Sequence, residues 1–246
     1  MRIDKTLQIG EFHTNHCEDF LITSQIGSHL ELIAVMDGCT MGEESAFASM
    51  LFGKILRNIA KQQFYQEFVN ATATDPVNLM KEVVKQLQKE LKHIKNQLGL
   101  NINELLSTLL LGIIDTQNHS AEVLVLGDGL VCYNGQLIEF EQGDKPDYLA
   151  YHLSEDFEEW YSQQKQRLSL SSIKDLSIST DGIFTFKNLM NKSKQLPEQE
   201  IIHTLLINGP DASGINFLDK KVRDLKEEAN HVVTDDLAII RVCSSS

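Results

Sequence analysis

Apolar residues divide the chain into an ordered set of patterns: strands, two long helices, strands again, helices and a final strand. Apolar and β-branched runs at 20–26 and 30–36 predict two strands joined by a turn. Apolar residues at helical spacing then predict helices over about 43–64 and 76–98. Regular alternation of strand and helix is absent, which disfavours a doubly wound parallel sheet. We therefore expect an α+β fold in which helices pack outside antiparallel sheets.

The second long helix carries signals at both of its ends. Pro76 suits the first helical position, and Asp75 suits the capping position before it. Gly99 is a common residue just beyond a helix end. We expect the loop that precedes this helix at 70–75.

Most of the predicted strands follow the second long helix. Apolar runs predict strands at 105–114, 121–126, 130–133, 137–140, 176–179 and 237–242. Asn134-Gly135, between two of these runs, is typical of a tight hairpin turn. Helical spacing returns at about 197–207 and 215–230.

The segment 141–170 interrupts this regular pattern. It is rich in charged residues and contains Tyr148, Tyr151, Tyr161 and the only tryptophan, Trp160. This aromatic content is too high for a disordered linker. We therefore expect a flap or inserted loop within a single domain of residues 1–246.

Charge and cysteine content exclude several classes of protein. The chain has 22 basic and 35 acidic residues, a net charge of −13, and such a field repels nucleic acid. No run approaches the ~20 apolar residues that a membrane-spanning helix needs. None of the four cysteines forms a Cys-x-x-Cys pair, so a zinc knuckle is not indicated. We expect free thiols and a cytoplasmic location.

Acidic residues recur where the predicted strands begin or end, and glycine often follows them. Hard divalent cations prefer carboxylate and carbonyl oxygens as ligands. A glycine after an aspartate lets the backbone approach such an ion closely. Ordinary turn chemistry is the alternative explanation for any single Asp-Gly pair. The recurring pairs are Glu18-Asp19, Asp37-Gly38, Asp128-Gly129, Asp181-Gly182 and Asp235-Asp236.

The order and surroundings of these pairs resemble the motifs of the metal-dependent protein phosphatases of type 2C, the PPM family. The family opens with a Glu-Asp motif and continues with an apolar strand that ends in Asp-Gly-His-Gly-Gly. It then has Gly-Asp-Ser, Ser-Asp-Gly, and Asp-Asn or Asp-Asp before a last apolar strand. The matching segments here are 17–19, 34–42, 126–129, 179–182 and 234–240.

The resemblance implies a four-layer α-β-β-α sandwich with two central antiparallel sheets. It also implies two Mg²⁺ or Mn²⁺ ions between the sheets, with a third, weaker metal position. Asp37 would bridge the two ions, and the Gly38 carbonyl would bind one of them. The remaining residues that the resemblance implies at or near the ions are Asp181 and Asp235 as ligands, Glu18 and Asp19 partly through water, and Asp128 at the third position.

The chain departs from the family pattern at two positions that matter for catalysis. Cys39 stands where the family usually has a histidine, its proposed general acid, and a thiol can also donate a proton. Thr14 stands where many members have a substrate-binding arginine. Both changes weaken phosphate binding or leaving-group protonation and leave the metal ligands in place. The histidines that are candidates to substitute are His13, His16 and His152.

Cys17 and Cys39 have two further interpretations. The first is a pair of buried free thiols, which is the ordinary role of cysteine inside a protein. The second is that they approach each other across the first hairpin and bind a softer metal.

The resemblance leads to two main hypotheses for function, beside a third in which the chain is a metal-dependent hydrolase of another phosphate ester. The first is a phosphatase that removes phosphate from phosphoserine or phosphothreonine in a phosphorylated protein, by attack of a metal-activated water. The second is a weakly active or non-catalytic relative that binds a phosphoprotein or regulates a partner. The retained aspartates favour the first, whereas Cys39 and Thr14 favour the second. The sequence does not indicate an oligomeric state.

Overall fold

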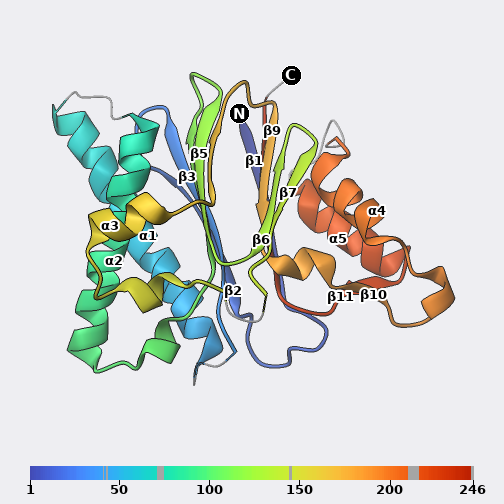
Figure 1. Cartoon of the computed structure of the whole chain (residues 1–246). Helices are drawn as coiled ribbons and strands as arrows, with labels where there is room; N and C mark the ends of the chain where they lie inside the picture. The colour runs from blue at the N-terminus through green and yellow to red at the C-terminus, as the bar shows by residue number, and fades with distance from the viewer. Residues whose placement is uncertain (41, 43, 71–74, 144–145, 210–215, 245–246) are drawn as a thin grey trace.

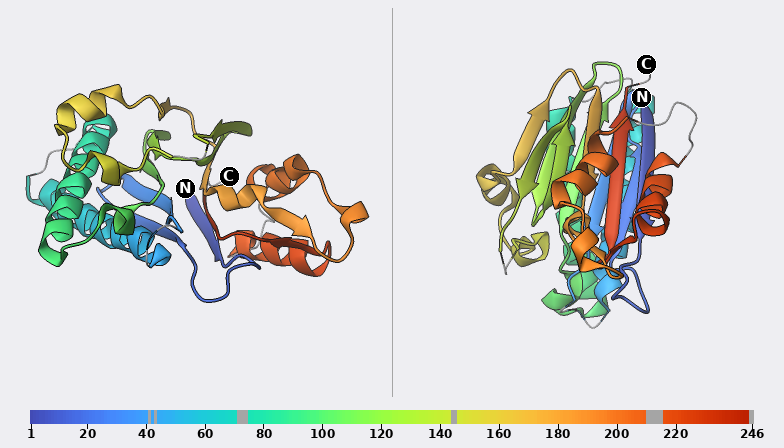
Figure 2. Two further views of the ribbon diagram at one scale, coloured as in Figure 1. Left: turned by 60° about the horizontal axis from the view of Figure 1, so that its bottom comes forward. Right: turned by 90° about the vertical axis from the view of Figure 1, so that its right-hand side faces the viewer.

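Two five-stranded antiparallel sheets lie face to face, and helices cover the outer face of each (Figure 1). The computed structural model describes residues 1–246 except 41, 43, 71–74, 144–145, 210–215 and 245–246. Figure 2 shows from two further directions that the N-terminal and C-terminal helices stay on opposite sides of the sheets. The predicted α+β fold, an α-β-β-α sandwich, is confirmed.

The strands of each sheet come from both halves of the chain. The first sheet has the order β1 (Arg2–Gln8), β12 (Leu237–Cys243), β9 (Asp175–Ser179), β6 (Gly129–Tyr133) and β7 (Gln136–Phe140). The second has the order β2 (Asp19–Gln25), β3 (Leu30–Asp37), β4 (Leu109–Asp115), β5 (Ser120–Leu126) and β8 (Arg167–Leu170). A separate small sheet pairs β10 (Phe186–Asn188) with β11 (His231–Val233).

The helices form the two outer layers. On the side of the second sheet lie α1 (Ser45–Asn70), α2 (Pro76–Leu98) and α3 (Phe157–Gln163). On the side of the first sheet lie α4 (Glu198–Ile202), the π-helical turn η5 (His203–Ile207) and α5 (Phe217–Glu227). Short 3-10 turns are η1 (Ile102–Leu105), η2 (Leu149–His152), η3 (Asp181–Phe184) and η4 (Lys192–Lys194).

The sequence of strand β3 is almost continuously apolar. Both of its faces are covered, so side chains that point in opposite directions are all buried. Ile33 and Val35 pack into the core between the two sheets. Leu32, Ala34 and Met36 pack into the core under α1 and α2. A third core lies between the first sheet and the C-terminal helices.

Both predicted end signals of α2 are confirmed. The Asp75 side chain accepts a hydrogen bond from the Asn78 backbone N–H, and Pro76 occupies the first turn. Gly99 ends the helix in the left-handed conformation, with φ of 69°. The hairpin turn also has its predicted form, because Asn134 and Gly135 have φ of 49° and 85°.

Several predicted boundaries change. The strand expected over 105–114 begins only at Leu109, because Asn101 and Glu104 form a capping box that starts η1 instead. Helix α1 continues beyond its predicted end at Phe64 to Asn70. Position 43 of the first predicted helix, position 215 of the last, and loop positions 71–74 lie outside the described residues.

The segment 141–170 contributes to the core under the N-terminal helices. Trp160 is 4% exposed and packs there with Phe157 and Tyr161. The end of the segment forms β8, which pairs with β5 and extends the second sheet. Lys81 and Lys85 of α2 form ion pairs with Glu158 of α3, and Figure 1 shows α3 on the same side of the sheets as α1 and α2.

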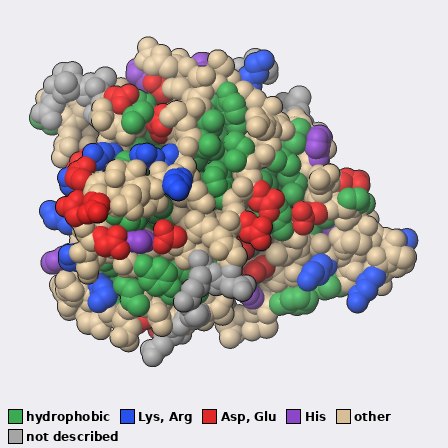
Figure 3. Space-filling view, viewed as in Figure 1, with side chains coloured by type: hydrophobic (Ala, Val, Ile, Leu, Met, Phe, Trp, Pro, Cys, Tyr) green, Lys and Arg blue, Asp and Glu red, His purple; other side chains and the backbone are tan. Residues whose placement is uncertain are grey.

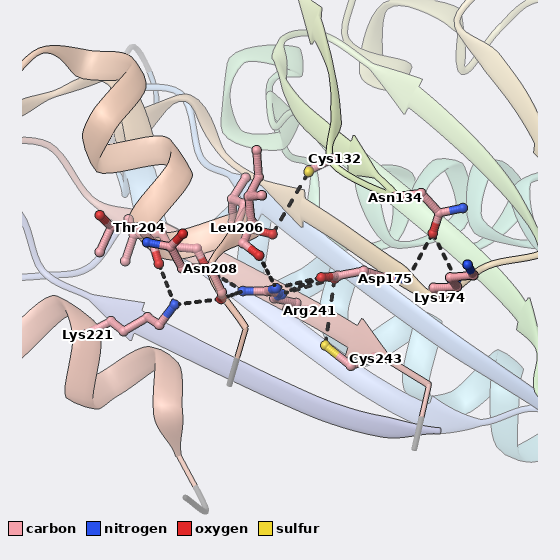
Figure 4. A network of polar contacts seen from close by, with 12 residues as sticks. Cys132, Asn134, Lys174, Asp175, Thr204, Leu206, Asn208, Lys221, Arg241 and Cys243 are labelled. Atoms are coloured by element: carbon pink, nitrogen blue, oxygen red, sulfur yellow. Dashed lines mark hydrogen bonds and ion pairs between the residues drawn. The ribbon is translucent and has the colours of Figure 1, made fainter. Parts of the chain in front are cut away.

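A buried arginine joins the C-terminal helical layer to the first sheet (Figure 4). Arg241 on β12 is 1% exposed and forms an ion pair with Asp175 on β9. Its guanidinium also donates to the backbone carbonyls of Leu205, Ile207 and Asn208 at the end of η5. A planar group with five donors can satisfy several helix-end carbonyls together.

Candidate active site

The two sheets contribute carboxylates to one place between them. Asp19 at the start of β2 lies opposite Asp37 at the end of β3 in the strand register. Thr180, which follows β9 in the other sheet, donates from Oγ1 to Asp19 Oδ2 over 2.6 Å. Thr180 Oγ1 also accepts from the Ala238 N–H on β12. Thr180 therefore connects the two sheets at the carboxylates.

The backbone around Asp37 is held by the two residues that precede β4. The Asp37 N–H donates to Thr108 Oγ1 over 3.0 Å, and the Thr108 N–H donates to the Asp37 carbonyl over 2.9 Å. Ser107 forms an isolated bridge with Gly38. A Cβ on Gly38 would collide with the Ser45 carbonyl at the start of α1. Glycine is therefore required here, because the chain after Asp37 runs against that helix.

Asp181 begins the turn η3 directly after Thr180. The next residue, Gly182, packs so closely on the Asp236 carbonyl that any side chain would collide with it. This contact places the start of η3 beside the segment that leads into β12. Asp128, from the turn before β6, and Asp235 both lie near enough to influence the charge of Asp181.

Asp235 and Asp236 have different roles although they are adjacent. Asp235 has a side chain that is 51% exposed. Asp236 is buried and accepts from the backbone N–H groups of Gly10 and Glu18. His13 lies between the two aspartates, with Nε2 3.4 Å from Asp235 Oδ1 and Nδ1 2.9 Å from Asp236 Oδ2. Asp236 thus fixes the N-terminal loop at the site.

Glu18 is held by residues at the start of the helical layer. Its Oε1 accepts from Ser45 Oγ over 2.5 Å, and its Oε2 accepts from Thr40 Oγ1 over 3.4 Å. The Glu18 carbonyl accepts from the Gly38 N–H and from Ser49 Oγ. The Glu18 side chain is therefore tied to α1 at the edge of the carboxylate group.

Burial and mutual repulsion disfavour ionisation of these carboxylates. Burial raises the pKa of Asp19 to about 8, although the hydrogen bonds from Thr180 and from Asp37 oppose this shift. Burial and the charges of Asp19 and Asp181 raise the pKa of Asp37 well above its usual value. Burial, Asp128 and Asp235 raise the pKa of Asp181 to about 6. A bound cation would oppose all of these shifts.

The donor chemistry of the group fits a hard divalent cation, because its side-chain donors are carboxylate oxygens. Among the described residues, however, no three Asp, Glu, His or Cys side chains are gathered so as to hold a metal ion. Asp19, Asp37 and Asp181 lie beside one another without closing around a common point. Metal binding here is therefore an inference from the donor chemistry.

Cys39, at the position of the missing histidine, lies beside the segment 141–170. Its N–H donates to the Leu106 carbonyl, and it packs against the core that contains Tyr148. Burial first, and then a hydrogen bond with Cys39, raise the pKa of the Tyr148 phenol, so this phenol stays protonated. All four cysteines are free thiols. Cys17 has a pKa raised to about 12, mainly by burial, and its Sγ lies 3.7 Å from the Gln8 carbonyl.

Several residues that the structure brings to the site have no role predicted from the sequence. Thr180, Asp236 and Tyr148 contact the predicted site residues, yet each is far along the chain from its partner. Of the histidines that are candidates to substitute, His13 lies at the carboxylates. His152 instead contacts Asp147 and Glu155 within the segment 141–170.

Comparison with known proteins identifies the family of this chain. The family model described as Protein phosphatase 2C matches residues 12–212, which is most of the chain. The chain belongs to the protein phosphatase 2C family. The resemblance inferred from the strand-end motifs is thereby confirmed. No curated protein sequence matches significantly.

Several solved structures share the fold. A point mutant of a bacterial serine phosphatase superposes with a TM-score of 0.64 at 13% identity, over 100% of this chain and 99% of the other. The serine/threonine phosphatase Stp1 from Staphylococcus aureus gives 0.62 at 11% identity, over 99% and 95%. RsbX in complex with magnesium gives 0.53 at 14% identity, over 96% and 92%.

The sequence of this protein phosphatase 2C member also predicts that no helix spans a membrane. Within the described part of the chain, no helix combines the length and the apolar character needed to cross a bilayer.

Proposed function

We propose that the chain is a metal-dependent phosphoprotein phosphatase that hydrolyses phosphoserine or phosphothreonine in a protein substrate. The observation that carries this proposal is the group of largely buried carboxylates from both sheets, Asp19, Asp37 and Asp181, each with a raised pKa. Carboxylates held together against their repulsion are costly unless a cation neutralises them. Membership of the protein phosphatase 2C family supports the same reaction.

In this proposal the cofactor is two ions of Mg²⁺ or Mn²⁺, with a third at a weaker position. Asp37 and the Gly38 carbonyl would hold the first ion, and Asp37 would also serve the second. When bound, the ions supply an activated water and neutralise the phosphoryl oxygens. The other residues proposed to hold ions are Asp181 and Asp235 as ligands, Glu18 and Asp19 partly through water, and Asp128 at the third position.

Residues around the carboxylates keep them in position. Thr180 orients Asp19, and Thr108 fixes the backbone of Asp37. At the leaving group, Cys39 is the proposed proton donor, and the protonated Tyr148 phenol lies beside it. A thiol without an oriented base is a weaker acid catalyst than a positioned histidine.

We further propose that residues 1–246 form one phosphatase domain. The two sheets share a core, and the structural similarity extends over nearly the whole chain. The four free thiols support a reducing, cytoplasmic location.

A second candidate function is a weakly active or non-catalytic phosphatase-like protein that binds a phosphoprotein. The observation that favours it is the pair of changes at Cys39 and Thr14, of which Thr14 is exposed beside His13. This candidate keeps metal and phosphopeptide binding and loses turnover.

Hydrolysis of an aryl phosphate and of a phosphoserine peptide, with Mn²⁺ and with EDTA, tests the proposal. We expect Mn²⁺-dependent hydrolysis of the aryl phosphate that falls about 100-fold or more in Asp181→Asn. The matched control Glu90→Gln, on the exposed face of α2, should retain full activity. Hydrolysis of the phosphoserine peptide should be much slower, because its leaving group needs protonation. Activity that survives both EDTA and Asp181→Asn would overturn the metal mechanism.

A further inference from the structure

A cavity of about 620 Å³ opens beside the site, between η3, β10 and α4. Its wall is formed largely by apolar side chains, including Ile183, Phe186, Leu196 and Ile201. Ile183, Phe186 and Ile201 are almost fully buried. The volume is sufficient for one or two large apolar side chains of a ligand.

The loop that forms the cavity is fixed by side-chain hydrogen bonds. Gln195 accepts from the Asn188 N–H and donates to the carbonyls of Phe186 and Leu196. His231 Nε2 accepts from the Leu196 N–H. The cavity is therefore preformed, which lowers the entropy cost of filling it.

The cavity and the proposed active site share one short segment of the chain. Ile183 and Phe184 belong to η3, the same short turn that begins with Asp181. The hydroxyl of the next residue, Thr185, accepts from the Asp235 N–H over 3.1 Å. One short segment thus contributes both a carboxylate to the site and the wall of the cavity.

Two basic residues line the cavity, although the chain as a whole is strongly acidic. Lys187 and Lys192 line it and are exposed, with one acidic residue, Glu198, also in the lining. In the part of the chain that the structure describes, neither lysine takes part in an ion pair. The net charge of the whole chain is −13, so this local excess of positive charge is unusual.

Exposed apolar side chains lie at the edge of the cavity, where Leu189 lines it, and continue beyond it. Leu189 is 50% exposed, Met190 is 85% exposed and Phe12 is 63% exposed. Lys187 lies over the Phe12 ring, 5.9 Å from its centroid. Figure 3 shows hydrophobic side chains flanked by two basic ones on the side of the molecule where β10 and β11 lie. An apolar surface with basic residues around it favours an apolar ligand with acidic flanks.

We infer that this cavity is a docking site for the phosphoprotein substrate itself. It takes a large apolar side chain of the substrate, and Lys187 and Lys192 contact acidic residues next to that side chain. This inference rests on the proposed phosphatase function, since the phosphorylated residue of the same segment would lie at Asp37 and Asp181. It adds a sequence preference that the carboxylates alone cannot impose.

The geometry sets the spacing between the phosphorylated residue and the apolar anchor. A 3-10 turn rises about 2 Å per residue, so Phe184 lies roughly 6 Å along the axis from Asp181. Half the width of a side-chain-sized cavity adds about 5 Å. At about 3.3 Å per residue of extended peptide, the anchor falls roughly three to four residues from the phosphoserine.

Labelled phosphoserine peptides test this docking site. The leucine is placed three, four or five residues from the phosphoserine, on either side, with two aspartates beside it. The reference peptide has alanine and serine at these positions. We expect kcat/KM for the best leucine peptide to exceed that of the reference by about tenfold or more, mainly through KM.

Two independent variants should abolish this preference. Lys187→Glu with Lys192→Glu reverses the local charge, and Leu189→Ser removes an exposed part of the wall. The matched controls are Lys92→Glu and Leu98→Ser on α2, which are exposed and remote from the cavity. Aryl phosphate hydrolysis should be unchanged in all of these proteins, because that substrate is too small to reach the cavity.

Binding of the same peptides in EDTA, followed by fluorescence anisotropy, separates the docking site from the phosphatase function. If no substrate is hydrolysed but the leucine peptide still binds about tenfold more tightly than the reference, the docking site stands and the proposed function fails. Equal binding of the two peptides, or a preference that survives both variants, overturns the docking site. Self-association of the wild type that the variants abolish would assign the cavity to a second copy of the chain and would also overturn it.

Discussion

The hydroxyl of Thr180 provides a direct test of how the two sheets are joined at the carboxylates. Thr180 is fully buried. Its Oγ1 donates to Asp19 over 2.6 Å and accepts from the Ala238 N–H over 2.9 Å. Thr180→Val keeps the shape of the side chain and removes both hydrogen bonds. Any loss of stability therefore reports the hydroxyl and not a cavity.

The expected loss depends on pH, because Asp19 has a pKa of about 8. At pH 6 Asp19 is protonated, so the lost bond is between neutral groups. Together with the Ala238 N–H left without a partner, it costs about 2 kcal/mol. At pH 9 Asp19 is ionised and the lost bond is charge-assisted, so the cost rises to about 3 to 4 kcal/mol.

The coupling between protonation of Asp19 and folding predicts the same change of stability with pH. The Thr180 hydroxyl lowers the pKa of Asp19, so its removal raises that pKa further above the unfolded value. A group with a raised pKa in the folded state contributes stability at low pH and loses it as the pH rises. The variant should therefore lose more stability than the wild type between pH 6 and pH 9.

Urea denaturation in EDTA at pH 6 and pH 9 measures these differences. The control Thr180→Ser keeps the hydroxyl and should lose only about 1 kcal/mol at either pH. A Thr180→Val protein within about 0.5 kcal/mol of the wild type would refute the role assigned to the hydroxyl. An equal loss at the two pH values would refute the coupling to Asp19.

Three other predictions concern the site. In EDTA the free energy of unfolding should fall as the pH rises from about 4 to 8, because the pKa of Asp19 is about 8 and that of Asp181 about 6 in the folded state. Asp181→Asn should flatten this slope, and a slope of opposite sign in urea titrations would contradict the burial argument. Gly182→Ala should lower the free energy of unfolding by about 3 kcal/mol or more, because the added methyl group collides with the backbone. The control Gly209→Ala has open space around it and should change the free energy of unfolding by less than about 0.5 kcal/mol. Equal shifts of the melting temperature in the two variants would exclude the collision. Cys39→His should raise hydrolysis of a phosphoserine peptide relative to an aryl phosphate by about tenfold or more, and an unchanged ratio would exclude a missing general acid.

Parts of the fold that depend on local chemistry could be predicted from the sequence. The continuous apolar run of β3 follows from burial on both faces, and Asp75 and Gly99 fix the ends of α2. Strand β1 could not be predicted in this way. Its inward positions include Asp4 and Thr6, which are buried because they bond to α5 and not because they are apolar. The alternation of apolar and polar residues is therefore hidden.

The candidate site also has a part that the sequence predicts and a part that it does not. The order of the strand-end aspartates identifies the family, because each motif is contiguous in the sequence. The contacts that hold these aspartates join residues far apart in the chain. Thr180 and Asp19 are separated by 161 positions, and Asp236 and Glu18 by 218. No periodicity within one element encodes such pairs, so they become visible only in the folded chain.

Diffraction from crystals grown with Mn²⁺ tests the central claim most directly. Anomalous difference maps should show two manganese ions in contact with Asp37, Asp181 and Asp235, and Asp181→Asn should lose at least one of them. Maps with no manganese at these carboxylates, at millimolar Mn²⁺ and neutral pH, would contradict a metal-dependent phosphatase.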